Sequence, residues 1–157
     1  MGFHLFIGNA LCAVDAAGAL ILPAFVRGTL SRRSDAGMIF AGTHEKDACL
    51  IAYDLGFVRS LAIDFTRRRI AEEAAAPLAH HARARRTFGL VEELLLDAGG
   101  SIRLPAILQR RARIDRIALI VGTGDAFEIW NPDLALESGD SGLRDLAAFH
   151  LEIQQAA

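Results

Sequence analysis

The feature that most constrains the fold of this chain is an internal repeat. Asp15–Ala24 reads DAAGALILPA, and 82 positions later Asp97–Ala106 reads DAGGSIRLPA. The aspartate, the glycine three positions after it and the closing Leu-Pro-Ala keep their places. A second matched pair follows at Asp47–Tyr53 and Asp125–Trp130. A repeat this long is not typical of a solenoid, so we expect two copies of one small motif to close a shared core.

Each copy predicts two short strands joined by an Asp-x-x-Gly turn. In the first copy the turn lies between Ala10–Val14 and Leu20–Leu22, and in the second between Val91–Leu96 and Ser101–Leu104. Aspartate favours the start of a turn, and glycine supplies the positive φ that such turns need. The pattern therefore predicts a strand–turn–strand hairpin in each half.

A short helix and further strands are expected after each hairpin. Pro23 and Pro105 end the strands and suit the first turn of a helix, where a missing N–H costs nothing. The helices are predicted at Phe25–Leu30 and Ile107–Ala112. Further strands are predicted at Met38–Ala41, Ala48–Tyr53, Ile117–Val121 and Ala126–Trp130. The predicted class is mostly β with flanking α-helices, in two pseudo-repeated halves.

Helices are expected between the halves and at the C-terminus. The stretch from about Leu55 to Phe88 is predicted to be helical and broken near Pro77. Its apolar face of Leu61, Phe65 and Ile70 would pack within the subunit or against another one. A short amphipathic helix is expected after the glycine-rich hinge at 139–142. The resulting divisions are 3–54 (first repeat), 55–88 (connecting helices), 89–136 (second repeat) and 137–157 (acidic tail).

Composition indicates one compact domain. The chain has 157 residues, of which 52% are apolar and 23% charged, as in ordinary soluble proteins. No apolar run approaches the ~20 residues of a membrane span, and the N-terminus does not resemble a signal peptide. Cys12 and Cys49 fit small buried hydrophobic residues of a reducing cytoplasm. We therefore expect a cytoplasmic protein with no membrane partner.

The charges are unevenly distributed. The formal net charge is −2, which by itself argues against nucleic acid as a partner. The cations, however, are nearly all arginine and occur in clusters, which are Arg32-Arg33, Arg67–Arg69, Arg83–Arg86 and Arg110–Arg116. Such clusters bind phosphates or form solvated helix faces, with acids such as Glu72 as partners. Taken alone, the clusters favour the solvated face.

Matched landmarks in both halves give the chain a family resemblance. In the first half they are Phe6-Ile7-Gly8, Asp15-x-x-Gly18 before Leu22-Pro23, and Cys49-Leu50-Ile51 with Tyr53. In the second half they are Phe88-Gly89, Asp97-x-x-Gly100 before Leu104-Pro105, and Phe127-Glu128-Ile129-Trp130. Over most of residues 3–136 the chain resembles the MraZ transcriptional regulators.

The resemblance implies a fold, a location and a partner. It implies two swapped-hairpin halves of the AbrB/SpoVT type that form a double-psi barrel-like core. It also implies a cytoplasmic, nucleoid-associated protein that forms ring-shaped homo-oligomers. The implied partner is DNA, at short direct repeats in the promoter of the division and cell-wall gene cluster. Antitoxins with the same half-fold fit less well, because they carry one half per chain.

The chain departs from the family at the implied DNA-contacting arginine of the motif Asp-x-x-x-Arg. Ala19 and Ser101 occupy those two positions, and Ile7 replaces an N-terminal arginine. Arg103 points to the same side of its strand as Ser101 and offers a nearby guanidinium. The predicted DNA-binding residues are Arg103, Arg27, Arg32 and Arg33, with Asp15, Gly18, Asp97, Gly100 and Ser101 of the two motifs. The alternative is a ring-forming structural or protein-interaction paralogue with weak or no DNA binding.

No pattern indicates an enzyme, a cofactor or a metal site. The Gly-Asp-Ser-Gly at 139–142 resembles a protease nucleophile loop, but that chemistry needs a histidine and an aspartate on a two-barrel fold. His80 and His81 are adjacent and would point about 100° apart on a helix. The two cysteines lack zinc-site spacing. Asp15 and Asp97 are better explained as turn caps than as general acids or bases. We expect no small-molecule substrate.

Overall fold

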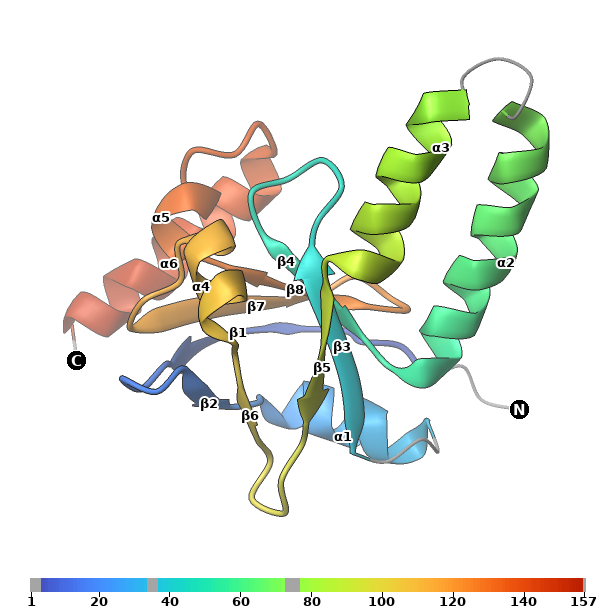
Figure 1. Cartoon of the computed structure of the whole chain (residues 1–157). Coiled ribbons are helices and arrows are strands. Elements are labelled where there is room, and N and C mark those ends of the chain that lie inside the picture. The colour runs from blue at the N-terminus through green and yellow to red at the C-terminus, as the bar shows by residue number, and fades with distance from the viewer. Residues whose placement is uncertain (1–3, 34–36, 73–76, 157) are drawn as a thin grey trace.

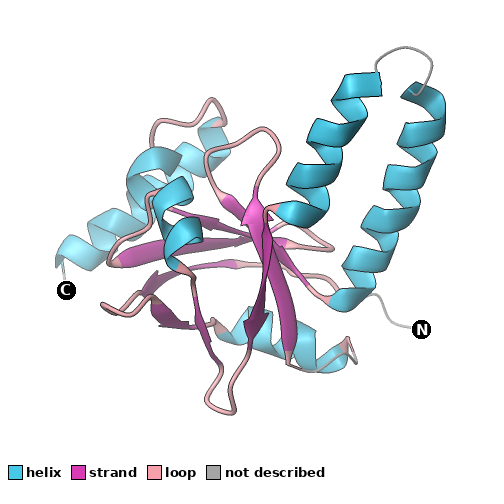
Figure 2. Cartoon of the chain, in the orientation of Figure 1, coloured by secondary structure: helices cyan, strands magenta, loops and turns pink. Residues whose placement is uncertain are grey.

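The computed structural model describes residues 4–33, 37–72 and 77–156 (Figure 1). Its strands are β1 (Asn9–Ala13), β2 (Ala19–Ile21), β3 (Met38–Thr43), β4 (Leu50–Tyr53), β5 (Val91–Leu95), β6 (Ser101–Arg103), β7 (Ile117–Gly122) and β8 (Phe127–Trp130). Its helices are α1 (Ala24–Arg32), α2 (Leu55–Glu72), α3 (Pro77–Ala84), α4 (Ala106–Ala112), α5 (Pro132–Ala135) and α6 (Ser141–Ala156), with a π-helical turn, η1 (Arg85–Gly89). Figure 2 shows strands at the centre and helices around them, so the expected mostly-β class with flanking helices is confirmed in outline.

The strands form a six-stranded antiparallel sheet, in the order β1-β7-β8-β4-β3-β5, and a two-stranded ribbon of β2 and β6. The sheet order is symmetric with respect to the two halves of the sequence. The first strand of one half, β1, pairs with β7 of the other, and β5 pairs in the same way with β3. In each half, the first two strands therefore pair only with strands of the other half.

This pairing corrects the expectation of two simple hairpins. The Asp-x-x-Gly turns form where they were predicted, but the strands on either side of each turn lie in different sheets. After the turn, β2 leaves the direction of β1 and pairs with β6, residue Leu20 opposite Ile102. Both side chains are almost fully buried, so this pairing places an apolar pair in the core. The swapped-hairpin and double-psi descriptions, like the four divisions of the chain, stay predictions.

Local conformation nevertheless agrees between the two repeated segments. Asp15–Ala24 and Asp97–Ala106 have the same succession of turn, three-residue strand, proline and helix start. Pro23 and Pro105 each stand immediately before the first residue of a helix, with similar extended backbone angles. The expectation that these segments share one local structure is confirmed.

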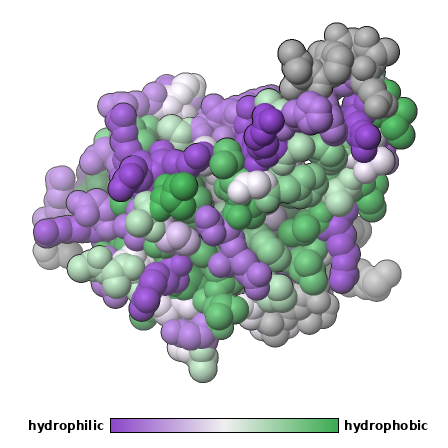
Figure 3. Space-filling view, in the orientation of Figure 1, coloured by the Kyte–Doolittle hydropathy of each residue, from purple (hydrophilic) through white to green (hydrophobic). Residues whose placement is uncertain are grey.

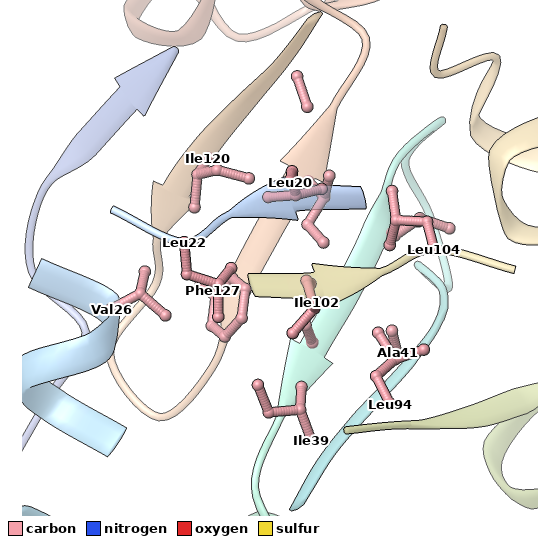
Figure 4. Packing of buried hydrophobic residues seen from close by; sticks show 14 of the residues in the cluster. Leu20, Leu22, Val26, Ile39, Ala41, Leu94, Ile102, Leu104, Ile120 and Phe127 are labelled. Atoms are coloured by element: carbon pink, nitrogen blue, oxygen red, sulfur yellow. The ribbon is translucent and has the colours of Figure 1, made fainter. Parts of the chain in front are cut away.

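The main core lies between the large sheet and the ribbon. Figure 4 shows ribbon side chains facing those of the sheet, among them Leu20, Ile102, Ile39, Ile120 and Phe127. All of them belong to one cluster of buried residues, and each is at most 2% exposed. Full burial of one such side chain contributes about 1.5–3 kcal/mol of transfer free energy. The ribbon is therefore fixed from its inner face.

The α2–α3 pair stands away from this core (Figure 1). No residue of the 18-residue α2 is buried, and Ile70, expected on its apolar face, is 73% exposed. Ile70 therefore does not pack within the subunit, because only the N-terminal part of α2 lies near the sheet, and its packing against another subunit stays a prediction. The expected break near Pro77 coincides with the start of α3, and residues 73–76 lie outside the described part of the chain.

The C-terminal helices cover a second, smaller cluster of buried residues. It contains Leu119, Trp130, Ala135 and Ala147, which come from β7, β8, α5 and α6, and Cys49, which directly precedes β4. Cys49 is buried as expected, whereas Cys12 is only half-buried. Burial raises the pKa of the Cys49 thiol strongly, and the carboxylates of Glu128 and Asp47 raise it further. The thiol therefore stays protonated at neutral pH.

We expect Cys49 to be unreactive in the folded protein, because the thiolate is the reactive form and the side chain is covered. In a Cys12→Ser variant, Ellman's reagent should label almost no thiol under native conditions. One thiol per chain should react in guanidinium chloride, which serves as the control. Rapid labelling of the native variant would contradict the described burial.

We also expect the inner face of the ribbon to dominate its contribution to stability. Leu20→Ala should lower the free energy of unfolding by about 2–5 kcal/mol, because it leaves a cavity in the core. Ile21→Ala, one residue along the same strand but 63% exposed, should change it by less than about 0.5 kcal/mol. Urea unfolding followed by circular dichroism compares the two. Equal effects would show that the ribbon does not close the core.

Candidate nucleic-acid interface

The ribbon of β2 and β6 presents one face to the outside. Its register places Ala19 opposite Arg103, Leu20 opposite Ile102 and Ile21 opposite Ser101. Because side chains alternate along a strand, the central pair points inward and the two outer pairs share the opposite face. This outward face consists of Ala19, Ile21, Ser101 and Arg103, and it includes both positions where the family motif has arginine.

The two aspartates hold the turns that carry the ribbon. One oxygen of Asp15, Oδ1, accepts hydrogen bonds from the backbone N–H groups of Ala17 and Ala19, each at 2.9 Å. In the second half, Oδ1 of Asp97 accepts from Gly99 and Ser101 at the same distance. Both carboxylates therefore cap turns, as expected from the sequence. They position the ribbon rather than supply chemistry.

The glycines of both motifs are required by backbone geometry. Gly18 and Gly100 have φ values of 85° and 82°, which side-chain-bearing residues rarely adopt. Their carbonyls accept hydrogen bonds from the far strand, Gly18 from Leu104 N–H and Gly100 from Leu22 N–H, both at 2.9 Å. A Cβ on Gly18 would lie 2.7 Å from the Leu104 oxygen. Each turn is thus joined to the strand end of the other half.

Arg27 has a structural contact that the sequence did not indicate. Its Nε donates to the Leu22 carbonyl at 2.8 Å, and its side chain covers Gly100. Gln109, at the matching position of α4, donates to the Leu104 carbonyl at 2.8 Å and covers Gly18. The two contacts are equivalent, so Arg27 attaches helix α1 to the ribbon. A DNA contact by Arg27 stays a prediction. It would use the guanidinium N–H groups other than Nε, because Nε already donates to Leu22.

Arg33 and Arg32 are adjacent but differ in environment. The Arg33 Nε lies 2.9 Å from Asp54 Oδ2, its Nη1 donates to the His4 carbonyl at 2.8 Å, and its guanidinium lies over the Phe6 ring. Only 15% of this side chain is exposed, so a phosphate contact would require these interactions to break. Arg32 is exposed in the last turn of α1. Helix α1 ends at Arg32, and Arg33 is the residue that follows it. The sequence alone did not show that the helix ends between the two arginines.

Arg103 is exposed on the outward face and lies directly opposite Ala19. Cβ atoms of directly opposed residues in antiparallel strands are about 4.5–5.5 Å apart. The Arg103 guanidinium can therefore reach the space that an arginine at position 19 would occupy. The second end of the face has no such group, since Ile21 opposes Ser101. The outward face is basic at one end and apolar at the other.

The structure also brings together three ionisable residues that sequence reasoning left apart. His44 Nε2 lies 3.4 Å from Glu128 Oε2, and Asp47 completes a cluster of possible metal-ligating atoms within 4.8 Å of one another. The other ring nitrogen, Nδ1, accepts from the N–H groups of Lys46 and Asp47 at 3.1 Å. A metal on Nε2 would place the ring proton on Nδ1, against those donors. The pattern therefore fits a close His–Glu pair better than a metal site.

Comparison with known proteins identifies the relatives of the chain. No model of a known protein family matches it. It is 30% identical over 135 residues to the transcriptional regulator MraZ of Cytophaga hutchinsonii, covering 85% of this chain and 83% of that protein. It is 34% identical over 135 residues to MraZ of Desulfitobacterium hafniense, with 83% of each covered. For Lactiplantibacillus plantarum MraZ the identity is 30% over 129 residues, covering 82% and 84%.

These relatives are transcriptional regulators, which is the class to which the sequence pointed. At this identity and coverage, the chain belongs to the MraZ family. The relatives' names are those of regulators rather than enzymes. Within the described residues, no helix combines the length and the apolar character needed to cross a membrane.

Proposed function

We propose that this protein is a DNA-binding transcriptional regulator that contacts DNA through the outward face of the ribbon. The observation that carries the proposal is the position of Arg103, exposed and directly opposite Ala19, on a ribbon whose turns are otherwise intact. Both aspartate caps and both positive-φ glycines are present, so the scaffold that presents this face is complete. The proposed target is the promoter of the division and cell-wall gene cluster, within the nucleoid.

The chemistry of the face sets what it can recognise. A guanidinium binds guanine through two hydrogen bonds, or a phosphate oxygen pair with similar geometry. With Arg103 alone, one ribbon offers one such group, whereas the family motif implies two. Exposed Arg32, at the end of α1, adds a cation suited to phosphate. We therefore propose binding that depends strongly on salt and that selects sequence weakly in each subunit.

Assembly into a ring-like homo-oligomer is part of the proposal. Repeated ribbons on one assembly multiply a weak contact, provided that several can reach the DNA together. Two surfaces offer apolar side chains to a neighbouring subunit: α2, with exposed Ile63 and Ile70, and α6, with exposed Phe149 and Ile153. These surfaces lie on different parts of the chain, as head-to-tail contacts in a closed ring require.

A second candidate function follows from the same face. Ser101 and 63%-exposed Ile21 make the end away from Arg103 neutral, and the exposed isoleucine suits a protein contact better than phosphate. The corresponding function is a ring-forming structural or protein-interaction module that binds DNA weakly or not at all. The experiments below distinguish the two functions.

We expect Arg103→Ala to weaken binding to the cluster promoter by about 5- to 150-fold, the equivalent of ~1–3 kcal/mol for one base-reading contact. Gln109→Ala, which removes a structural side chain of similar size, serves as a control for stability. Ala19→Arg and Ser101→Arg should tighten binding to the promoter more than binding to a random duplex of equal length. Fluorescence anisotropy at two salt concentrations measures each variant.

Two outcomes of that titration would count against the proposal. Promoter-selective binding that Arg103→Ala leaves unchanged would place DNA recognition elsewhere on the molecule. No binding by the wild type, with binding gained by Ala19→Arg and Ser101→Arg, would favour the structural module.

We expect the protein to be larger than a dimer in solution, because α2 and α6 expose apolar residues on separate surfaces. Multi-angle light scattering at micromolar concentration gives the mass directly. Ile70→Asp should reduce the mass if α2 lies in an interface, whereas Ile107→Asp, also exposed but on α4, should not. A monomeric wild type would overturn the ring proposal.

A further inference from the structure

A cavity of about 340 Å³ lies between the large sheet and the α2–α3 pair. Its walls are the loop between β3 and β4, the inward side of α2, the end of α3 with η1, and the start of β5. Figure 3 shows hydrophobic surface around the helical pair on this side, bordered by hydrophilic side chains. No residue of the ribbon lines the cavity, so it is separate from the proposed DNA-binding face.

The floor and one wall of the cavity are aromatic and aliphatic. Phe57, Leu61 and Phe65 recur at intervals of four along α2, so they share one helix face. Tyr53, at the end of β4, lies beside Phe57, with ring centroids 4.9 Å apart. The three α2 side chains are only half-buried, although they face the sheet. Space therefore remains where a packed helix would have filled it.

Cations surround the opening of the cavity. The charged lining residues are Lys46, Arg68, Arg83 and Arg86, against Glu45 and Asp64. Asp64 lies 3.3 Å from Arg68, and Glu45 lies 4.0 Å from Arg86. Arg83 is paired with Glu72, outside the lining. Lys46 forms no ion pair with any other described residue, so the lining keeps an excess of positive charge.

We propose that this cavity binds a small organic anion with a flat apolar body. Apolar rings would lie between Tyr53 and the α2 face, and the anionic group would meet Arg68 and Lys46 at the opening. The volume falls in the range of ligand-binding cavities, about 300–1,000 Å³, and the combination of apolar walls with a few charged groups is typical of such sites. Cation and anion complementarity sets the sign of the ligand.

This inference goes beyond the proposed DNA-binding function and does not depend on it. It also accounts for the unusual exposure of α2, which contacts little of the sheet. An occupant of the cavity would contact the β3–β4 loop, α2 and α3 together. Ligand binding therefore stabilises the attachment of the helical pair, since any molecule that binds only the folded state raises its stability.

The probe is 8-anilinonaphthalene-1-sulfonate, and N-phenyl-1-naphthylamine is its neutral counterpart with the same rings. We expect the sulfonate to bind the full chain saturably, at one site per chain, and more tightly than the neutral compound. Leu61→Trp, which fills the cavity, should weaken binding at least about tenfold. Arg68→Gln should weaken it about three- to tenfold by removing a charge-assisted contact.

Matched variants on the same helix control for folding. Ser60→Trp and Arg67→Gln alter exposed residues outside the cavity and should leave the affinity unchanged. The melting temperature gives a second measurement: the sulfonate should raise it for the wild type but not for Leu61→Trp.

Three results would overturn the proposal. The first is binding that does not saturate, or that Ser60→Trp weakens as much as Leu61→Trp does. The second is equal affinity for the charged and the neutral probe. The third is that the wild type does not bind the sulfonate, while Leu61→Trp and Arg68→Gln each lower the mass measured by light scattering. Those two observations together would mean that a second copy of the chain fills the cavity.

Discussion

The structure depends on the antiparallel pairing of β2 with β6. Each strand has three residues, and each is fixed at its end by a hydrogen bond to the carbonyl of a turn glycine in the other half. Residues other than glycine rarely adopt the positive φ of those turns, and at Gly18 a Cβ would also come too close to the Leu104 carbonyl. The pairing brings Leu20 and Ile102 together above the large sheet and fixes which side chains face outward. Core and candidate interface are thus two faces of one ribbon.

Much of this arrangement could be predicted from residues with strong local preferences. Asp15 and Asp97 predicted capped turns, the prolines predicted the helix starts, and both are confirmed. The partners of each strand could not be predicted. Alternation identifies the buried face of a strand but not its neighbour, so the hairpin interpretation assigned β1 to β2, whereas β1 pairs with β7. The sequence left the partner of Ile70 open for a similar reason, because helical spacing does not reveal how far along its length a helix stays near the sheet.

Prediction of the candidate site was limited in the same way. The sequence singled out the arginines but could not separate Arg33, which contacts Asp54, from exposed Arg32. It placed Arg103 beside Ser101, whereas the register adds that Arg103 faces Ala19. The cavity beneath α2 joins residues from the β3–β4 loop, α2 and η1. No local pattern links these segments, so only the three-dimensional structure shows their aromatic and cationic side chains together.

The outward face of the ribbon has one further consequence. The pairing of β2 with β6 is symmetric about the Leu20–Ile102 pair. If β2 and β6 had the same residues, the two ends of the face would be identical, and a partner could lie along it in either direction. With Arg103 at one end and Ile21 at the other, the two orientations are no longer equivalent. A partner lying along the ribbon meets a cation first in one direction and a branched aliphatic side chain first in the other. Each subunit therefore has a polarity, although its backbone is built from two similar halves.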